Sequence, residues 1–341
     1  MIARKLLPLC FLAITAWSFT GNSGPVFPTP ENWPPPQYSF ANNPLSESKI
    51  KLGRMLFYDP ILSRDSSISC ASCHTSFNAF SHADHKLSHG IGDQIGTRNA
   101  PALINMAWAK SFMWDGAINH LDVQPLGPIS NPIEMNESIA HVVEKLQRSP
   151  LYRRLFREAF HNDSITGEYA LKAMSQFLVM LISDQSKYDS VMRHQSQFTA
   201  QEDRGYALYK KNCAACHTEP LFTNNNFENN GLPQDTLLRD AGRIKVTQRP
   251  EDSLRFKVPT LRNAEFSYPY MHDGRFKTLR EVLQHYTSGI KHSATLSTHL
   301  QQPILLTENE RTDLLAFLLT LTDRNFVFTE KFRYPRNIPA H

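Results

Sequence analysis

Several features that would mark other classes of protein are scarce or missing in this chain of 341 residues. Charged residues make up 20% of it, the formal net charge is +4, and no run rich in Lys and Arg occurs, so the sequence does not indicate a nucleic-acid partner. Its long apolar run, from Leu6 to Phe19, is shorter than the about 20 residues that a transmembrane helix needs. Segments with the alternating pattern of β-strands are few, whereas helical periodicity is frequent in both halves. The expected fold class is therefore all-α.

The apolar run has the layout of a secretory signal peptide. Arg4 and Lys5 precede it and small residues follow it, so we expect residues 1–23 to be removed on export to the periplasm. Cys10 lies inside the run and follows a leucine, which argues against a lipid anchor. The next segment, residues 24–44, has six prolines in one stretch of twelve residues and is expected to be an extended linker.

Cysteine is rare, and its placement is informative. The chain has five cysteines, of which four remain after the signal peptide, in the sequences CASCH (residues 70–74) and CAACH (residues 213–217). In a C-x-x-C-H motif the two thiols lie one helical turn apart and can add across the vinyl groups of a haem, while the adjacent histidine reaches the iron. We therefore expect two c-type haems, attached through the cysteines and ligated by the histidines of the two motifs: Cys70, Cys73, Cys213, Cys216, His74 and His217.

Three other interpretations of the cysteine pairs are weaker. A four-cysteine zinc site has its pairs about 15 to 20 residues apart, whereas most of a domain separates these pairs. A thioredoxin-like C-x-x-C needs neither a following histidine nor a second copy. Two disulfides within such short loops would be unusual, and the export signal agrees with haem attachment.

The two motifs belong to an internal repeat. GRMLF (residues 53–57) precedes the first motif, and GYALY (residues 205–209) precedes the second. Farther on, PALINMAWAKSFMWDG (residues 101–116) and PTLRNAEFSYPYMHDG (residues 259–274) have Pro, Leu, Asn, Met, Asp and Gly at the same offsets. Because the matched segments follow in the same order, the repeat unit is a whole domain.

Helix signals support this division. Each half closes with an apolar helix, and two helices of the second half begin at capping boxes, Thr199 with Glu202 and Thr307 with Glu310. We expect two cytochrome-c-like helical domains, residues 45–195 and 196–341, each with one covalently bound haem.

The sixth axial position of each iron decides the function, because a filled position suits electron transfer and an open one can bind peroxide or oxygen. Twelve residues after Gly274 comes Tyr286, and twelve residues after Gly116 comes Pro128. The repeat therefore predicts a phenol at the second haem and a ring without a donor atom at the first. Other residues that could ligate the second haem are His285, His292 and Met271.

Two polar residues lie near Pro128 in the sequence, Gln124 and Glu134. A carboxylate over an open iron could take a proton from the near oxygen of peroxide and return it to the far one, which is general acid/base catalysis. The alternative for Glu134 is a solvated loop acid. The predicted open site favours the catalytic role.

With these motifs, the chain resembles the bacterial di-haem cytochrome c peroxidase family, which includes the MauG-type enzymes. The resemblance covers about residues 44–325, and its motifs follow in the family's order: CASCH, GTRNAPALIN, FMWDG, GPISNPIEMN, CAACH, KVPTLRN and YPYMHDG. It implies that peroxide is reduced at the N-terminal haem with electrons from the C-terminal haem. It also implies that Trp114 relays these electrons and that His272 lies near the haem edges. For Trp114, the alternative is a buried aromatic residue with a packing role only.

The resemblance further implies a calcium ion between the domains, bound by the side chain of Asn99 and the carbonyls of Ser267 and Pro269. Oxygen donors suit a hard cation. The chain departs from the simpler peroxidases at Tyr286, where they have a methionine and the MauG type has a tyrosine. Those peroxidases also use a loop histidine as a resting ligand of the first haem. Here we assign none of the three candidates, which are His82, His85 and His89.

Three functions follow as hypotheses. The first is a periplasmic peroxidase that reduces hydrogen peroxide with electrons from a small periplasmic donor protein, either a c-type cytochrome or a cupredoxin. The second is a MauG-like enzyme that oxidises a partner protein as its substrate. The third is a di-haem electron carrier without catalysis, against which Pro128 and Glu134 argue. The oligomeric state, a homodimer included, stays open.

Overall fold

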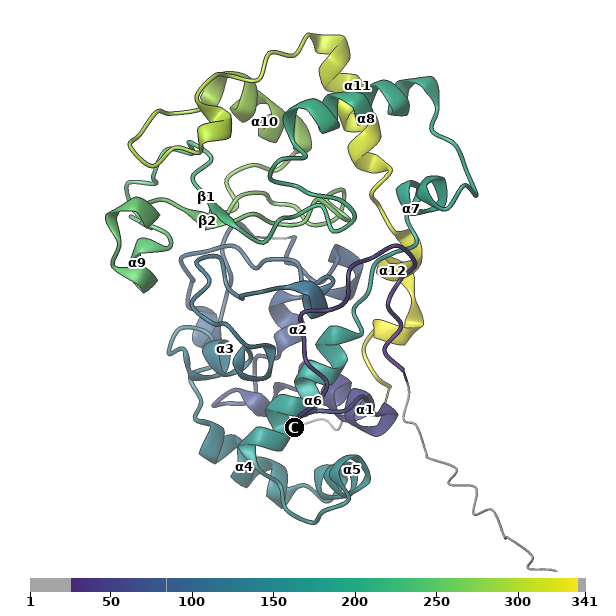
Figure 1. Cartoon of the computed structure of the whole chain (residues 1–341). Coiled ribbons are helices and arrows are strands. Elements are labelled where there is room, and N and C mark those ends of the chain that lie inside the picture. Colours follow the sequence, from purple (N-terminus) through teal and green to yellow (C-terminus); the bar gives the residue numbers. More distant parts are fainter. Residues whose placement is uncertain (1–25, 84, 337–341) are drawn as a thin grey trace, which may run out of the picture.

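The computed structural model describes residues 26–83 and 85–336, so the predicted signal peptide lies outside the described residues. Figure 1 shows two helical halves stacked on each other, with α1 to α6 in the lower half and α8, α10 and α11 in the upper half. The helices of the first half are α1 (Glu47–Tyr58), α2 (Cys70–Cys73), α3 (Leu126–Ser130), α4 (Ile139–Arg148), α5 (Pro150–Phe160) and α6 (Gly167–Val179). The all-α prediction is confirmed.

The remaining chain forms six more α-helices within the described residues. They are α7 (Lys187–Met192), α8 (Ala200–Asn212), α9 (Ile244–Thr247), α10 (Leu279–Gln284), α11 (Glu308–Leu319) and α12 (Arg324–Phe328). A π-helical turn, His285–Gly289, continues α10. In the described part of the chain, strands are limited to β1 (Phe227–Glu228) and β2 (Phe256–Lys257), which pair in an antiparallel manner.

The central helix pair of each half crosses at a glycine. A Cβ atom on Gly53 of α1 would lie 1.9 Å from the carbonyl oxygen of Ala173 in α6, and a Cβ on Gly205 of α8 would lie 2.0 Å from the carbonyl oxygen of Asp313 in α11. Only glycine permits such close backbone approach. The glycines of GRMLF and GYALY are therefore required for the same structural reason, the close contact of two helices.

Both capping boxes predicted in the second half are present. The hydroxyl of Thr199 accepts from the N–H of Glu202 while the Glu202 carboxylate accepts from the Thr199 N–H, at 3.2 and 2.7 Å. Thr307 and Glu310 make the same pair of bonds, at 3.2 and 2.7 Å. These bonds satisfy backbone donors that the first helical turn leaves without a partner.

The internal repeat extends to backbone conformation. Asn105 and Asn263 both adopt the left-handed conformation, with φ of 55° and 56°. The side-chain oxygen of Asn105 accepts from the N–H of Ser183 at 2.9 Å, and that of Asn263 accepts from the N–H of Asp323 at 2.7 Å. In each half the repeated asparagine thus fixes the chain just after the last long helix.

The two halves do not divide cleanly along the sequence. Phe326 and Phe332, which follow the second half, pack in the same core as Phe57 and Phe80 of the first half. Residues 324–334 therefore lie with the first half in space, although we expected the second domain to extend to the end of the chain.

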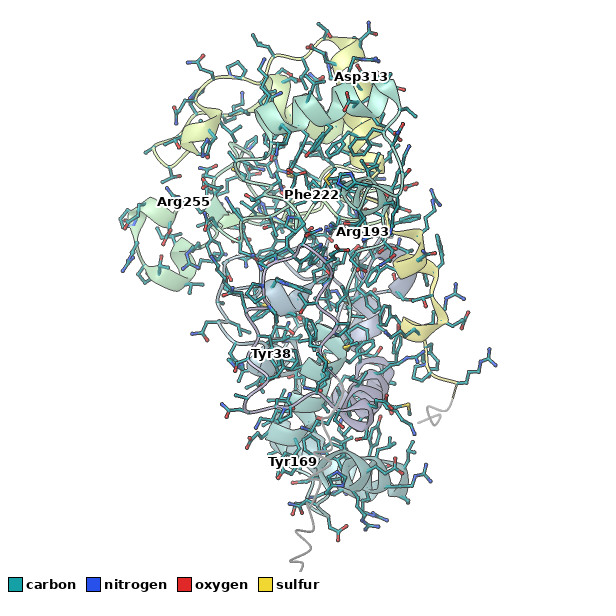
Figure 2. All side chains as sticks on the ribbon, turned by 45° about the vertical axis from the view of Figure 1, so that its right-hand side comes forward. Tyr38, Tyr169, Arg193, Phe222, Arg255 and Asp313 are labelled. Atoms are coloured by element: carbon teal, nitrogen blue, oxygen red, sulfur yellow. The ribbon has the colours of Figure 1, made fainter. Side chains whose placement is uncertain are left out.

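The described part of the proline-rich segment, residues 26–44, has neither helix nor strand and contains turns, and it packs on the first half. Trp33 and Trp108 have ring centroids 4.9 Å apart, and Trp108 Nε1 donates to the carbonyl of Pro34 at 2.7 Å. Tyr38, labelled within the first half in Figure 2, is 7% exposed and belongs to the core.

No helix among the described residues is long and apolar enough to cross a membrane.

Candidate functional site

One cavity of about 570 Å³ lies between the two halves and reaches both C-x-x-C-H motifs. Its wall includes Cys73 and His74 of the first motif and Cys213, Cys216 and His217 of the second. The four described cysteines form no disulfide. The structure therefore brings both predicted haem attachment sequences to one interior space.

The first motif folds as a single helical turn. Ser69 and Ser72 form a capping box at the start of α2, and the N–H of His74 donates to the carbonyl of Cys70 at 2.9 Å. The His74 Nδ1 lies 2.8 Å from the carbonyl oxygen of Phe80. This contact fixes the ring and leaves Nε2 for a metal ion, as in most histidine ligands.

The second motif has the same geometry. The N–H of His217 donates to the carbonyl of Cys213 at 2.9 Å. His217 Nδ1 lies 3.2 Å from the carbonyl oxygen of Phe222 and 3.1 Å from that of Pro259. Figure 2 shows Phe222 in the interior of the second half, where it is fully buried. Burial lowers the pKa of both motif histidines, that of His74 to about 4, so both rings are neutral and able to ligate at neutral pH.

The thiols are unsuited to redox chemistry of their own. Burial raises the pKa of Cys70 and Cys213 to about 12 and that of Cys73 to about 11. Burial also raises the pKa of Cys216. Thioredoxin-like sites lower the pKa of a thiol to generate a nucleophile. The donor set and the anchored histidines fit two covalently attached haems instead.

We expect the purified protein to carry two c-type haems per chain, because both motifs are complete and both histidines are oriented. Pyridine haemochrome analysis should give two c-type haems for each polypeptide. A count of one, or haem that acid acetone extracts, would contradict the assignment.

The first half contributes Gln124, Pro128 and Glu134 to the cavity wall. Burial raises the pKa of Glu134, and a hydrogen bond from Asn131 Nδ2 to Glu134 Oε1, at 2.7 Å, opposes the rise. Glu134 and Cys73 both belong to the cavity wall, and the charge of Glu134 contributes to the raised pKa of Cys73. The three residues predicted near the first haem are thus all on the wall of this cavity.

The loop that carries Glu134 is held by the preceding loop. A Cβ on Gly90 would lie 2.0 Å from the carbonyl oxygen of Ile133, and the N–H of Ile91 donates to the carbonyl of Glu134 at 2.7 Å. Backbone contacts of this kind position a side chain more firmly than an exposed loop does.

The second half contributes Tyr286 and Met271 to the wall. Tyr286 belongs to the π-helical turn after α10, an irregularity often found at functional sites. Burial raises the pKa of the Tyr286 phenol to about 12. Of the other predicted candidates, His285 lies 3.0 Å from the carbonyl oxygen of Asn230 through Nε2, and His292 is exposed. Neither is part of the cavity wall.

The three loop histidines are close to one another but lie outside the cavity wall. Ring centroids are 5.2 Å apart for His82 and His85 and 4.2 Å apart for His85 and His89. His89 Nδ1 lies 2.8 Å from a carboxylate oxygen of Asp93.

The repeated turns meet at the junction of the two halves. Trp114 lines the cavity and donates from Nε1 to the carbonyl of Asn99 at 2.8 Å. His272 also lines the cavity and stacks on Phe256 at 3.6 Å between ring centroids, and its backbone carbonyl accepts from the N–H of Asn99 at 2.7 Å. Burial lowers the pKa of His272 to about 4. The indole and the imidazole therefore occupy matching places on either side of one junction.

One side-chain network at this junction was not predicted. Arg98 donates to Asp115 at 2.6 Å and to Asp240 at 2.6 and 2.9 Å. The pKa of Asp240 is held well below its usual range by Arg98, which outweighs the effect of burial. Asp240 lies outside the repeated segments, so the alignment of the two halves gave no signal for it.

Two C-x-x-C-H sites that share one cavity in a helical protein of two halves define a di-haem c-type cytochrome. Comparison with protein families narrows the class: the family described as di-haem cytochrome c peroxidase matches residues 47–197, and the cytochrome c family matches residues 202–322. The chain belongs to the di-haem cytochrome c peroxidase family. It is an oxidoreductase of the cytochrome c peroxidase type, and two c-type haems are its cofactors, as predicted.

Relatives of both named kinds are similar over most of their length. The methylamine utilization protein MauG of Methylorubrum extorquens is 38% identical over 86% of this chain and 83% of its own. The cytochrome c551 peroxidase of Nitrosomonas europaea is 35% identical over 83% of this chain and 82% of its own. A crystal structure of a MauG-like protein associated with microbial copper homeostasis has a TM-score of 0.82 and 32% identity, over 90% of this chain and 98% of that chain.

Proposed function

We propose that this enzyme reduces hydrogen peroxide to water at the first haem with electrons that enter at the second. The observation that carries this proposal is the difference between the halves at equivalent places in the repeat, Pro128 against Tyr286, both on the cavity wall. His74 would hold the first haem, whose iron would supply a site for peroxide, while His217 and Tyr286 would hold the second, which would supply electron transfer. Proline has no donor atom that could close the first position.

Glu134 is proposed as the general acid/base. Its carboxyl group is part of the cavity wall and its pKa is raised by burial, so it can hold and release a proton closer to neutral pH than an exposed glutamate. The hydrogen bond from Asn131 orients the carboxyl group. Gln124, whose amide lies 3.9 Å from the sulfur of Met113, is proposed to place a hydrogen-bond donor in the same pocket.

Trp114 is proposed as the residue that carries electrons between the two haem sites. Its indole is on the cavity wall, and its N–H bond to Asn99 orients the ring at the junction of the halves. An indole can be oxidised and reduced reversibly, whereas proline and aliphatic side chains cannot.

Replacing Trp114 by Phe should keep peroxide binding but slow the delivery of electrons to the first haem. Phenylalanine preserves an aromatic ring for packing and is much harder to oxidise. Stopped-flow spectra should show the first haem oxidised by peroxide while its re-reduction lags behind the wild type. Trp108 to Phe is a matched control, since Trp108 also lines the cavity but donates to Pro34 outside the repeat junction. Wild-type rates for both steps in the Trp114 variant would leave Trp114 a packing role only.

A calcium ion at the junction is proposed for the oxygens near Asn99. Asn99 Oδ1 is buried without a hydrogen-bond partner among the described residues, and the Asn99 amide lies 2.5 Å from the carbonyl oxygen of Pro269. Ser267 lines the same cavity. Side-chain and carbonyl oxygens of this kind are calcium ligands.

The donor and the compartment are also proposals. An export signal and c-type haem attachment support a periplasmic enzyme that receives electrons from a small c-type cytochrome or a cupredoxin. A second candidate function is oxidation of a partner protein, supported by the similarity to MauG proteins and by Tyr286 on the wall of the second pocket.

Steady-state peroxide turnover with a small c-type cytochrome as donor tests the first function. We expect turnover that depends on both substrates. No turnover with any donor, together with oxidation of a co-purifying protein after peroxide addition, would favour the second function.

A further inference from the structure

Lys257 is a cation on the cavity wall whose position is fixed at two points. Its backbone N–H donates to the carbonyl of Trp114 at 2.7 Å, and its Nζ donates to the carbonyl of Ser111 at 2.6 Å. It is the last residue of β2 and pairs with Phe227 of β1. Because directly paired residues share one face of a sheet, Lys257 and the neighbouring Glu228 point to opposite faces.

The ammonium group of Lys257 lacks an anionic partner among the described residues. Four charged residues line the cavity: Arg98, Glu134, Glu228 and Lys257. Arg98 is paired with two carboxylates, those of Asp115 and Asp240. Among the described residues, the contacts of its Nζ are the carbonyl of Ser111 and the ring of Phe112, whose centroid lies 5.8 Å away, and burial lowers its pKa to about 8. A carbonyl and an aromatic ring leave a buried cation without a counter-charge, which is unfavourable, so these contacts alone do not account for the charge.

The internal repeat shows that the contact itself does not need a charge. Lys257 aligns with Asn99, whose N–H donates to the carbonyl of His272 at 2.7 Å and whose amide donates to the carbonyl of Pro269 at 2.5 Å. His272 and Pro269 are the repeat partners of Trp114 and Ser111. The contacts that Asn99 and Lys257 make across the junction are thus equivalent, and a neutral amide makes one of the two. The contact with Ser111 therefore gives no reason for a positive charge at position 257.

We propose that Lys257 binds a carboxylate of a haem and so acts as the internal counter-charge of the cofactor. Each haem has two propionate groups, which would enter this cavity when the haem is bound, and Lys257 is the wall cation that no carboxylate of the described residues neutralises. The proposal rests on haem binding and does not depend on the reaction proposed above. Either haem could supply the carboxylate, and the potentials of the two haems distinguish them.

The test compares Lys257→Met and Lys257→Arg with the wild-type holoprotein. Methionine keeps the length of the chain and removes the charge, whereas arginine keeps the charge. Lys51→Met, at an exposed position of α1, is the control for a lost surface charge. Spectroelectrochemical titration gives the reduction potential of each haem, and haem content is measured alongside.

Loss of the charge should make one haem harder to reduce in Lys257→Met. The expected change in its reduction equilibrium constant is about tenfold, the order of one unit charge acting through protein at an effective dielectric of about 20. Lys257→Arg should restore most of the potential, and Lys51→Met should leave both haems unchanged. Unchanged potentials in Lys257→Met, or equal shifts in the Met and Arg variants, would overturn the proposal.

A second measurement covers the case in which Lys257→Met fails to load haem. In a crystal structure of the wild-type holoprotein, Nζ of Lys257 should lie within about 4 Å of a haem carboxylate, the usual limit for an ion pair. The assignment would be refuted if the haem carboxylates paired with other groups and Nζ of Lys257 still donated only to the carbonyl of Ser111.

Discussion

Replacing Glu134 by Gln is expected to reduce peroxide turnover by about 10²-fold or more, the usual effect of removing a general acid/base group. Glutamine keeps the shape of the side chain and the contact with Asn131 but cannot carry the proton. Haem content and the reduced spectrum should stay as in the wild type, because neither depends on the carboxyl group. Steady-state kinetics with a saturating donor measures the effect.

A pH profile separates this role from a structural one. Since burial raises the pKa of Glu134, and a carboxylate accepts a proton only when it is deprotonated, wild-type turnover should fall as the pH decreases through this raised pKa. The Gln variant should lose that acid limb and stay slow at every pH. Glu144→Gln, at an exposed position of α4, is the matched control. Wild-type turnover in Glu134→Gln would make Glu134 a loop acid.

Local signals predicted the architecture well. The capping boxes at Thr199 and Thr307 require only neighbouring residues, and both are present. The repeat predicted equivalent helices and turns in the two halves, because equal spacing along the chain gives equal local geometry. Gly53 and Gly205 illustrate this, since each sits where two helices touch.

Contacts between distant and unrepeated segments could not be predicted. Asp240 pairs with Arg98 across the junction, yet no local pattern marks it as a partner. Phe332 packs in the core of the first half, although the whole second half separates it from that half in the sequence. The repeat aligns Lys257 with Asn99 and so could have predicted its position at the junction. That its charge has no carboxylate partner could be seen only from the residues that line the cavity. Long-range packing decides such contacts, and the sequence records it only indirectly.

The proposed difference between the two haem sites depends mainly on Tyr286. Burial raises the pKa of its phenol to about 12, so the protein alone keeps the group protonated. A bound metal cation reverses this preference, because coordination stabilises the ionised form of a ligand. A phenolate is a hard, anionic ligand that favours ferric iron, whereas a methionine thioether is neutral and raises the potential of a c-type haem. The second haem should therefore be six-coordinate and low in potential.

Substituting Met for Tyr286 should raise the potential of the second haem and add a methionine-to-iron absorption at the red end of the ferric spectrum. Tyr286→Phe should remove the ligand without replacing it, so the second haem should lose its six-coordinate ferric spectrum. Met271→Leu is the matched control, since Met271 lies on the same wall and its sulfur accepts from Asn230 at 3.5 Å. If Met271→Leu changes the spectrum and both Tyr286 variants do not, the thioether of Met271 is the ligand, and the MauG-like function loses its main structural support.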